Sequence, residues 1–334
     1  MSHMETEARE APEVVARFLE KNDKALKELG ARLRKFPPPM IITCARGSSD
    51  NAAGYFKYLT EILLGVPCAS VGASVVSVYD APLKLKGGLC LTISQSGKSP
   101  DIVALQDAAK KAGALTVALV NTEESPAAKN ADICLTLQAG QELSVAATKS
   151  FIVSLVAGAA VASHWLEDQN RINILRGLPA IFEKATHLNW PELIDLAVKA
   201  ESLYVLGRGP CLPVAGEIAL KLKETCAIHA EAYSIAEVMH GPLELLGEGF
   251  PIFALSPDDQ ALPFSVEAFQ KMRAIGADLV VAGKGGLEIV KTGDPLFDPI
   301  SMIQTAYLAI EKVAQLKGRD PDRPRLLKKI TETI

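Results

Sequence analysis

The sequence predicts an α/β fold of two tandem domains, each a parallel sheet with helices on both faces, in a flavodoxin-like or Rossmann-like three-layer arrangement. Short, continuous apolar runs alternate with helix-length segments, and the alternation occurs twice along the 334 residues. Continuous apolar strands are typical of parallel sheets that are covered on both faces. The composition, with 49% apolar, 22% charged and only 5% aromatic residues, suits helix-on-sheet packing.

The first half begins with an amphipathic helix, which we expect over residues 12–35. Its apolar stripe is formed by Val15, Phe18, Leu19, Leu26, Leu29 and Leu33. Three consecutive prolines at 37–39 end it. Buried strands are expected at 40–44, 89–93, 115–120 and 133–137. Helix-length segments such as 51–63 and 99–111 lie between them.

The second half repeats this pattern, with strands expected at 202–206, 251–255 and 278–282. A mostly helical stretch, 146–200, separates the halves and is expected to be interrupted near Pro179 and Pro191. The strand end at 43–47 is mirrored by 205–209, and the apolar pattern of 88–114 by that of 249–277. We therefore predict a tandem duplication. The alternative is two unrelated α/β domains with similar periodicity.

Charge and cysteine usage limit the class of protein. A formal net charge of -4 argues against a nucleic-acid binder held by bulk electrostatics, but it allows an anionic small ligand. The six cysteines include no CxxC spacing, which fits a reducing cytosol and disfavours a zinc ribbon. Residues 1–4 are typical of an expression-tag remnant, no signal peptide is expected, and the apolar run 151–162 is short for a membrane span. We expect a cytoplasmic protein with no membrane partner.

Ligands of open parallel sheets bind beyond the carboxyl ends of the strands, which directs attention to three loops. The first is Ala45-Arg46-Gly47-Ser48-Ser49, where Ser48 or Ser49 could cap the next helix. The second, Ser94-Gln95-Ser96-Gly97-Lys98-Ser99, precedes Pro100 and Asp101 and suits a phosphate cradle, although it is not a Walker P-loop. The third is 140–148. Alternatively, all three are ordinary caps and turns.

The corresponding second-half loop, Ser256-Pro257-Asp258-Asp259, carries two acids that would repel phosphate. The helix expected over 212–226 instead offers chemistry: Glu217, Lys221 and Glu224 share one face. Spacing alone favours a solvent-facing set of ion pairs there.

Histidines are the remaining candidates for proton transfer. His240 lies in a Gly-Pro turn, where a group with a pKa near 6.5 could shuttle protons or serve a structural role. His164 and His187, in the helical middle, are expected to be packing or surface groups. The basic tail 318–331 would ordinarily be frayed.

Taken together, these strings resemble the sugar-isomerase (SIS) domain family. The likeness is greatest to the isomerase half of glucosamine-6-phosphate synthase and to the second-type glucosamine-6-phosphate deaminases, and it covers nearly all of the chain after residue 12. The strings that carry it are Gly47-Ser48-Ser49, Ser94-Gln95-Ser96-Gly97, Val145-Ala146-Ala147-Thr148-Lys149, Leu220-Lys221-Leu222-Lys223-Glu224, His229-Ala230-Glu231-Ala232-Tyr233, His240-Gly241-Pro242, and Asp322-Arg323-Pro324-Arg325 with Lys329.

The resemblance implies a role for each matching residue. The sugar phosphate would be held by Ser49, Ser94, Gln95, Ser96 and Ser99. Val145 and Ala147 would approach the sugar. Apart from the resemblance, Lys221 is a cation on the same helix face as Glu224 and could orient it, so we count Lys221 among the substrate-binding groups. Glu224 would move the proton between C1 and C2, His240 would assist ring opening from the partner subunit, and Lys329 would line the sugar site, where it could form a Schiff base. A homodimer with the active site at its interface is implied, with no metal and no other cofactor.

The implied organisation is a tag remnant and disordered start (1–11), a helix (12–36), a first SIS domain with the phosphosugar-binding loops (37–168), a helical connector (169–195), a second SIS domain with Glu224 and His240 (196–320) and a tail closing the sugar site (321–334).

Three departures from the synthase affect the expected activity. No cysteine precedes Cys44, so a glutaminase nucleophile is not expected. Lys98 replaces an acidic residue, and Lys328 a small one. We therefore expect a glutamine-independent deaminase that converts glucosamine 6-phosphate to fructose 6-phosphate. The alternatives are a phosphosugar aldose–ketose isomerase, a fructosamine-phosphate deglycase, a galactosamine-6-phosphate deaminase, or a non-catalytic sugar-phosphate sensor.

Overall fold

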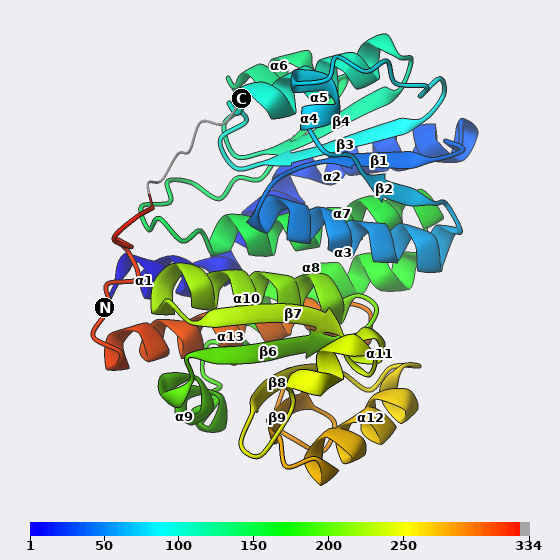
Figure 1. Cartoon of the computed structure of the whole chain (residues 1–334). Helices are drawn as coiled ribbons and strands as arrows, with labels where there is room; N and C mark the ends of the chain where they lie inside the picture. Colours follow the sequence, from blue (N-terminus) through cyan, green and yellow to red (C-terminus); the bar gives the residue numbers. More distant parts are fainter. Residues whose placement is uncertain (328–334) are drawn as a thin grey trace. The chain divides into compact units, whose positions relative to one another are not determined.

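The structure is a computed structural model that describes residues 1–327, which form two compact units (Figure 1). The first unit comprises Met1–Pro12, Leu143–Thr148 and residues 177–327. The second comprises Glu13–Glu142 and Lys149–Arg176. Each unit contains one parallel sheet, which confirms the predicted fold class.

The second unit is built on a five-stranded sheet in the order β2-β1-β3-β4-β5. Its strands are β1 (Ile41–Cys44), β2 (Cys68–Ser70), β3 (Leu89–Ser94), β4 (Leu115–Val120) and β5 (Ile133–Thr136). One face is covered by α4 (Ser74–Ser77), α5 (Pro100–Lys111) and α6 (Pro126–Asn130), whose apolar residues pack on β1, β3 and β4. The other face carries α3 (Ser48–Leu64) and α7 (Lys149–Leu166), which lie side by side (Figure 1). The strands are buried, as the apolar runs predicted.

The first unit is built on a four-stranded sheet in the order β7-β6-β8-β9. Its strands are β6 (Ser202–Gly207), β7 (His229–Ser234), β8 (Pro251–Ser256) and β9 (Asp278–Gly283). Apolar residues of α11 (Ile235–Val238) and α12 (Leu262–Ala274) cover one face. The strands also contact α9 (Pro191–Lys199) and α10 (Cys211–Cys226). The long helix α13 (Asp298–Leu316) packs against α9 and α10. A short 3-10 helix, η1 (Gly241–Leu245), follows α11.

The two sheets share one topology, as the predicted duplication requires. In each, the first strand in sequence lies second in the sheet, with the second strand at its outer edge. The backbone is repeated in detail, because Gly47 and Gly209 both have a φ of 57° after the first strand. The amide of Gly87 donates to the carbonyl of Gly113 at 3.0 Å, and that of Gly249 to the carbonyl of Gly276 at 2.8 Å.

Several local expectations were wrong. The start of the chain is not disordered, because α1 spans His3–Arg9 and is capped by Ser2. No break occurs near Pro179, which lies inside α8 (Gln169–Ala185). The buried Leu175, Leu178 and Phe182 hold that helix on its core despite the proline. Strands β2 and β7 were not anticipated, and α2 spans Ala11–Lys35, close to the expected 12–35.

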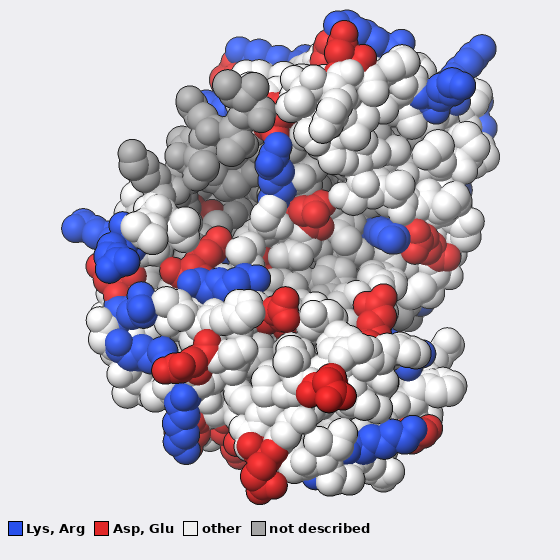
Figure 2. Space-filling model, viewed as in Figure 1, with Lys and Arg blue, Asp and Glu red and all other residues white. Residues whose placement is uncertain are grey.

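Within residues 1–327, α7 is the one helix long and apolar enough to cross a membrane by those two criteria, yet 94% of it is buried inside the protein. It therefore serves as a core helix of its unit. Acidic and basic side chains are interspersed over the face shown in Figure 2 rather than separated by sign.

The contact between α2 and α7 gives a first prediction. A Cβ at Gly30 would lie 2.4 Å from the carbonyl oxygen of His164, whereas a Cβ at Gly177 in α8 would meet nothing within 4 Å. We expect Gly30→Ala to lower the free energy of unfolding by about 1–3 kcal/mol through overpacking. Gly177→Ala should raise it by about 0.5–1 kcal/mol through helix propensity. Urea denaturation measures both, and equal stability of Gly30→Ala and wild type would contradict the described packing.

Candidate functional site

The turn between β1 and α3 carries the first predicted loop. Gly47, with a φ of 57° and a ψ of -131°, occupies the N-cap position, and no side-chain hydrogen bond caps the helix. The expected capping by Ser48 or Ser49 is therefore wrong, because both are already helical. Both serines are partly buried at the start of a 17-residue helix, where backbone N–H groups favour an anion.

The loop between β3 and α5 is held in shape by its own side chains and by its neighbours. The Ser94 hydroxyl accepts the N–H of Gly97 at 3.1 Å, and the Ser96 hydroxyl that of Lys98 at 3.3 Å. The Gln95 carbonyl accepts the N–H of Asn121 at 3.1 Å. The serines and Gln95 are thus displayed on a pre-organised backbone, as a phosphate cradle requires.

Gly97 is required in this loop for two reasons. Its φ is +63°, and a Cβ there would lie 2.2 Å from the hydroxyl oxygen of the buried Ser125. Ser99 is the N-cap of α5 without a side-chain capping hydrogen bond, and Pro100 follows in the first turn, as expected. The helix therefore begins at this loop with its N-terminus uncapped by Ser99.

In the first unit, the segment with Val145 and Ala147 is tied to both ends of the chain. The N–H of Val145 donates to the carbonyl of Asp322 at 3.3 Å. The carboxylate of Asp322 accepts the N–H groups of His3 and Met4, each at 2.7 Å. Val145 and Ala147 are half-buried in this irregular segment. The backbone that would approach a sugar is therefore fixed by the described part of the tail.

The most distinctive cluster of ionisable groups lies where α10 packs on α13. The ammonium of Lys221 is 3.1 Å from Oε1 of Glu217 and 2.8 Å from Oε2 of Glu224. The hydroxyl of Tyr307 donates to Oε1 of Glu217 at 2.9 Å. The side chains of Glu217 and Lys221 are 0% and 1% exposed, and that of Glu224 is 24% exposed. The solvent-facing interpretation of this helix face was therefore wrong.

The surroundings of Lys221 keep it charged. Burial alone would lower its pKa, but the carboxylates of Glu217 and Glu224 outweigh that effect and raise the pKa above its usual range. Lys221 is thus a permanent cation at neutral pH. Glu224 is the member of this cluster that reaches the surface of its unit, with one carboxylate oxygen held by the lysine.

His240 is exposed and forms the N-cap of η1, with Pro242 in the first turn. Lys329 and Lys328 lie outside the described residues. His187 is exposed and His164 largely buried, in agreement with surface and packing roles.

The carboxyl edge of the four-stranded sheet, β6–β9, is chemically different from that of the five-stranded sheet, β1–β5. The carboxylate of Asp258 is 3.0 Å from Nζ of Lys284 and 3.8 Å from that of Lys291. The carboxylate of Asp259 accepts the N–H of Ala261 at 2.9 Å, just before α12. This edge therefore supplies its own anions.

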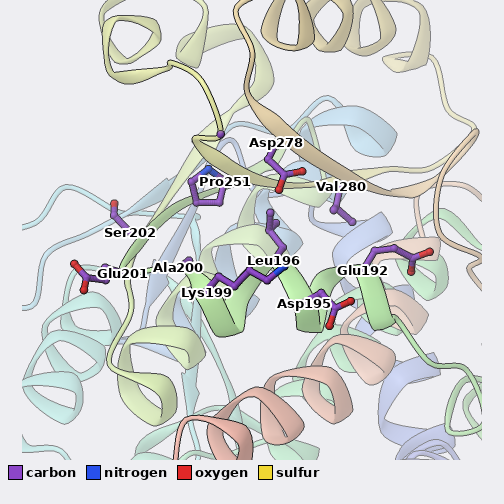
Figure 3. Close-up of a pocket in the computed structure, with 11 residues that line it drawn as sticks. Glu192, Asp195, Leu196, Lys199, Ala200, Glu201, Ser202, Pro251, Asp278 and Val280 are labelled. Atoms are coloured by element: carbon purple, nitrogen blue, oxygen red, sulfur yellow. The ribbon is translucent and has the colours of Figure 1, made fainter.

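A pocket of about 500 Å³ lies at the opposite, amino-terminal edge of that sheet (Figure 3). Ser202, Pro251 and Asp278, which begin three strands, line it with residues of α9. It contains none of the predicted site residues, and ligands of parallel sheets bind at the other edge. No group of three or more His, Cys, Asp or Glu able to hold a metal ion is found among residues 1–327.

The buried ion pair predicts a strong effect of Lys221 on stability. Lys221→Met leaves Glu217 as a buried carboxylate without this cation, and we expect a loss of about 3–5 kcal/mol in the free energy of unfolding. Lys271→Met is the matched control, because Lys271 forms an i,i+4 pair with Glu267 in which both side chains are more than half exposed. It should cost at most about 1 kcal/mol. Equal losses in urea denaturation would contradict the described burial.

Comparison with known proteins places these features in context. The glutamine–fructose-6-phosphate aminotransferase (isomerizing) of Zymomonas mobilis is 33% identical over 98% of this chain, which spans 58% of that relative's length. A protein of Silicibacter pomeroyi, described as a candidate phosphosugar isomerase, has a crystal structure with a TM-score of 0.92 and 43% identity, covering 96% of this chain and 100% of that chain.

The crystal structure of glucosamine-6-phosphate deaminase from Thermotoga maritima shares the fold, with a TM-score of 0.79 and 22% identity over 99% of this chain and 100% of that chain. The family model described as the SIS domain matches residues 37–164 and again residues 196–290. The double match confirms the tandem duplication. The chain therefore belongs to the SIS domain family and contains two copies of the domain.

Proposed function

We propose that this chain is an aminosugar-phosphate deaminase that converts glucosamine 6-phosphate and water to fructose 6-phosphate and ammonia. The observation that carries the proposal is Glu224, a partly exposed carboxylate whose oxygen is held 2.8 Å from a buried, cationic lysine. A carboxylate fixed in this way suits the transfer of one proton between adjacent carbons. The choice of substrate and product follows the names of two similar proteins: the Zymomonas mobilis relative is named for fructose 6-phosphate, and the Thermotoga maritima protein, which shares the fold, is named a glucosamine-6-phosphate deaminase.

Phosphate binding is assigned to the first SIS domain, for which we retain the boundaries 37–168. Ser49 lies in the first turn of α3. The constrained loop before α5 displays the hydroxyl and amide groups of Ser94, Gln95, Ser96 and Ser99. Helix N-termini with such groups bind phosphate. Because the phosphate is remote from C1 and C2, its binding energy can orient the reacting part of the sugar.

Proton transfer is assigned to the second SIS domain, within 196–320. After ring opening, assisted by His240 of the partner in a homodimer, Glu224 removes the proton from C2 of the aldehyde form. The electrons of that C–H bond form the C1–C2 double bond of an enolamine, while the π bond of the aldehyde breaks and its oxygen takes up a proton to become a hydroxyl. Returning the first proton to C1 breaks the C1–C2 double bond, and the nitrogen gives up a proton as its lone pair forms an imine at C2. Water hydrolyses this imine to the ketone with loss of ammonia. Lys221 orients Glu224, and Val145, Ala147 and Lys329 are proposed to line the sugar.

A second candidate is isomerisation of a phosphosugar without loss of ammonia. It is favoured by the 43% identity to the Silicibacter pomeroyi protein described as a candidate phosphosugar isomerase. The same proton transfer by Glu224 would serve it. A deglycase of fructosamine phosphates, or a deaminase of galactosamine 6-phosphate, would also use these groups.

The proposal is tested by ammonia release from glucosamine 6-phosphate. We expect release by the wild type and a loss in kcat of about 10²- to 10⁴-fold in Glu224→Gln, because the amide cannot accept the proton. Glu267→Gln, which removes an exposed carboxylate of α12, is the control and should retain wild-type activity.

The other outcomes of this assay are informative. Exchange of the C2 proton with solvent deuterium, followed by NMR with no ammonia released, would select the isomerase. Full activity of Glu224→Gln would remove the carboxylate from the mechanism. A wild type that neither releases ammonia nor exchanges the C2 proton would leave a non-catalytic sugar-phosphate sensor as the better description.

A further inference from the structure

Arg46 lies in the turn after β1, immediately before Gly47 and the helix that carries Ser49. Its guanidinium forms an ion pair with the carboxylate of Asp101, in the first turn of α5. The pair therefore connects the two loops to which phosphate binding is assigned. Both residues belong to the second unit.

The two partners differ sharply in burial. The side chain of Asp101 is 0% exposed, whereas that of Arg46 is 48% exposed. Apart from this ion pair, neither carboxylate oxygen of Asp101 has a hydrogen-bond partner among the described residues. The guanidinium of Arg46 is therefore the group that balances its charge. A buried carboxylate is costly without such a partner. Asp101 thus fixes one side of Arg46 and leaves the other side facing solvent.

A guanidinium has five N–H donors and can serve two anions at once. The N-termini of α3 and α5 begin at the two loops that Arg46 connects, and neither N-cap residue makes a side-chain capping hydrogen bond. A carboxylate in the first turn of α5 would by itself oppose an incoming anion, so the cation is needed at this place. We propose that Arg46 binds the phosphoryl group of the substrate, sharing its guanidinium between that group and Asp101. This inference rests on the proposed function.

The duplicated half provides an internal comparison. Arg208 occupies the position of Arg46, between Gly207 and Gly209 after β6. It is close enough to Asp259 to act on its carboxyl, since burial raises the pKa of Asp259 and Arg208 opposes that shift. There the protein's own carboxylate accepts the N–H of Ala261 at 2.9 Å, before α12. In the first half the acid is Asp101, which is buried within the first turn of its helix rather than before the helix. No carboxylate caps α5. The first-half position therefore suits an anion from solution.

The experiment is a calorimetric titration of the full chain with inorganic phosphate, using wild type, Arg46→Gln, Asp101→Asn and the double variant. We expect Arg46→Gln to weaken phosphate binding by about 10- to 100-fold, the range for a hydrogen bond to a charged group. Asp101→Asn should bind at least as tightly as wild type, because the arginine is released and a negative charge removed. The double variant should bind about 10-fold or more weaker than Asp101→Asn.

The double variant is decisive, because it contains no buried carboxylate that could unfold the protein when Arg46 is lost. If it binds phosphate as tightly as Asp101→Asn, Arg46 only neutralises Asp101 and the proposal is overturned. Lys129→Gln removes one exposed cation of the same unit and should change the affinity by less than about 2-fold. A loss equal to that of Arg46→Gln would show that net charge alone is at work, and would also overturn the proposal.

The titration is independent of the chemistry assigned to Glu224. If the wild type releases no ammonia but the four affinities follow the expected pattern, the deaminase proposal fails and the phosphate role of Arg46 stands. If ammonia is released but Arg46→Gln binds phosphate like wild type, the reverse holds.

Discussion

Parallel strand pairing is the constraint on which the rest of the structure depends. Every strand pair described in both sheets is parallel, so each strand must be followed by a crossover that returns the chain to the same end of the sheet. The crossovers place helices on the faces and bury the strands. They also bring every strand-to-helix turn to one edge. The loops after β1 and β3 are neighbours for that reason, although about 50 residues of sequence separate them.

The two copies of the domain use this shared edge in opposite ways. Gly47 and Gly209 have the same φ, so the first turn has kept its backbone in both copies. In the second copy, Asp258 and Asp259 occupy the loop after the third strand in sheet order, where the first copy has serines and Gly97. Because a carboxylate of the protein already accepts a backbone N–H before α12, we do not expect this loop of the second copy to bind a phosphate. It is then free to carry other chemistry on α10.

The sequence correctly predicted the strands that are buried on both faces. It did not predict the strands in which polar residues interrupt the apolar run. Runs such as 89–93 and 115–120 are strands because they are buried on both faces, and continuous apolar character reports that directly. Strand β7 was missed because His229, Glu231 and Tyr233 alternate with alanines in an edge strand, so the apolar run is absent. Pro179 misled because packing of its helix outweighs the local cost of a proline.

The candidate site shows the same limit. The serine loop could be recognised from its composition and its place after a strand, but spacing could not reveal whether α10 shows its charged face to solvent or to α13. Nor could it reveal the pairing of Arg46 with Asp101, whose positions are far apart in sequence. Contacts of this kind depend on how crossovers align two loops, which no local pattern encodes.

The burial of Lys221 between two carboxylates is better explained by its effect on the position of Glu224 than by a contribution to the stability of the fold. Replacing a buried ionic cluster with apolar side chains is often neutral or stabilising, so stability alone gives no reason to keep one. The cluster does give Glu224 a fixed partner: Lys221 is held from behind by Glu217, and Glu217 in turn accepts the hydroxyl of Tyr307 on α13. Each member is thereby restrained by the next, and the packing of α10 on α13 sets the position of the carboxylate. The orientation of Glu224 therefore depends on Tyr307, a residue far away in sequence, and the packing of the two helices is itself part of the catalytic geometry that we propose.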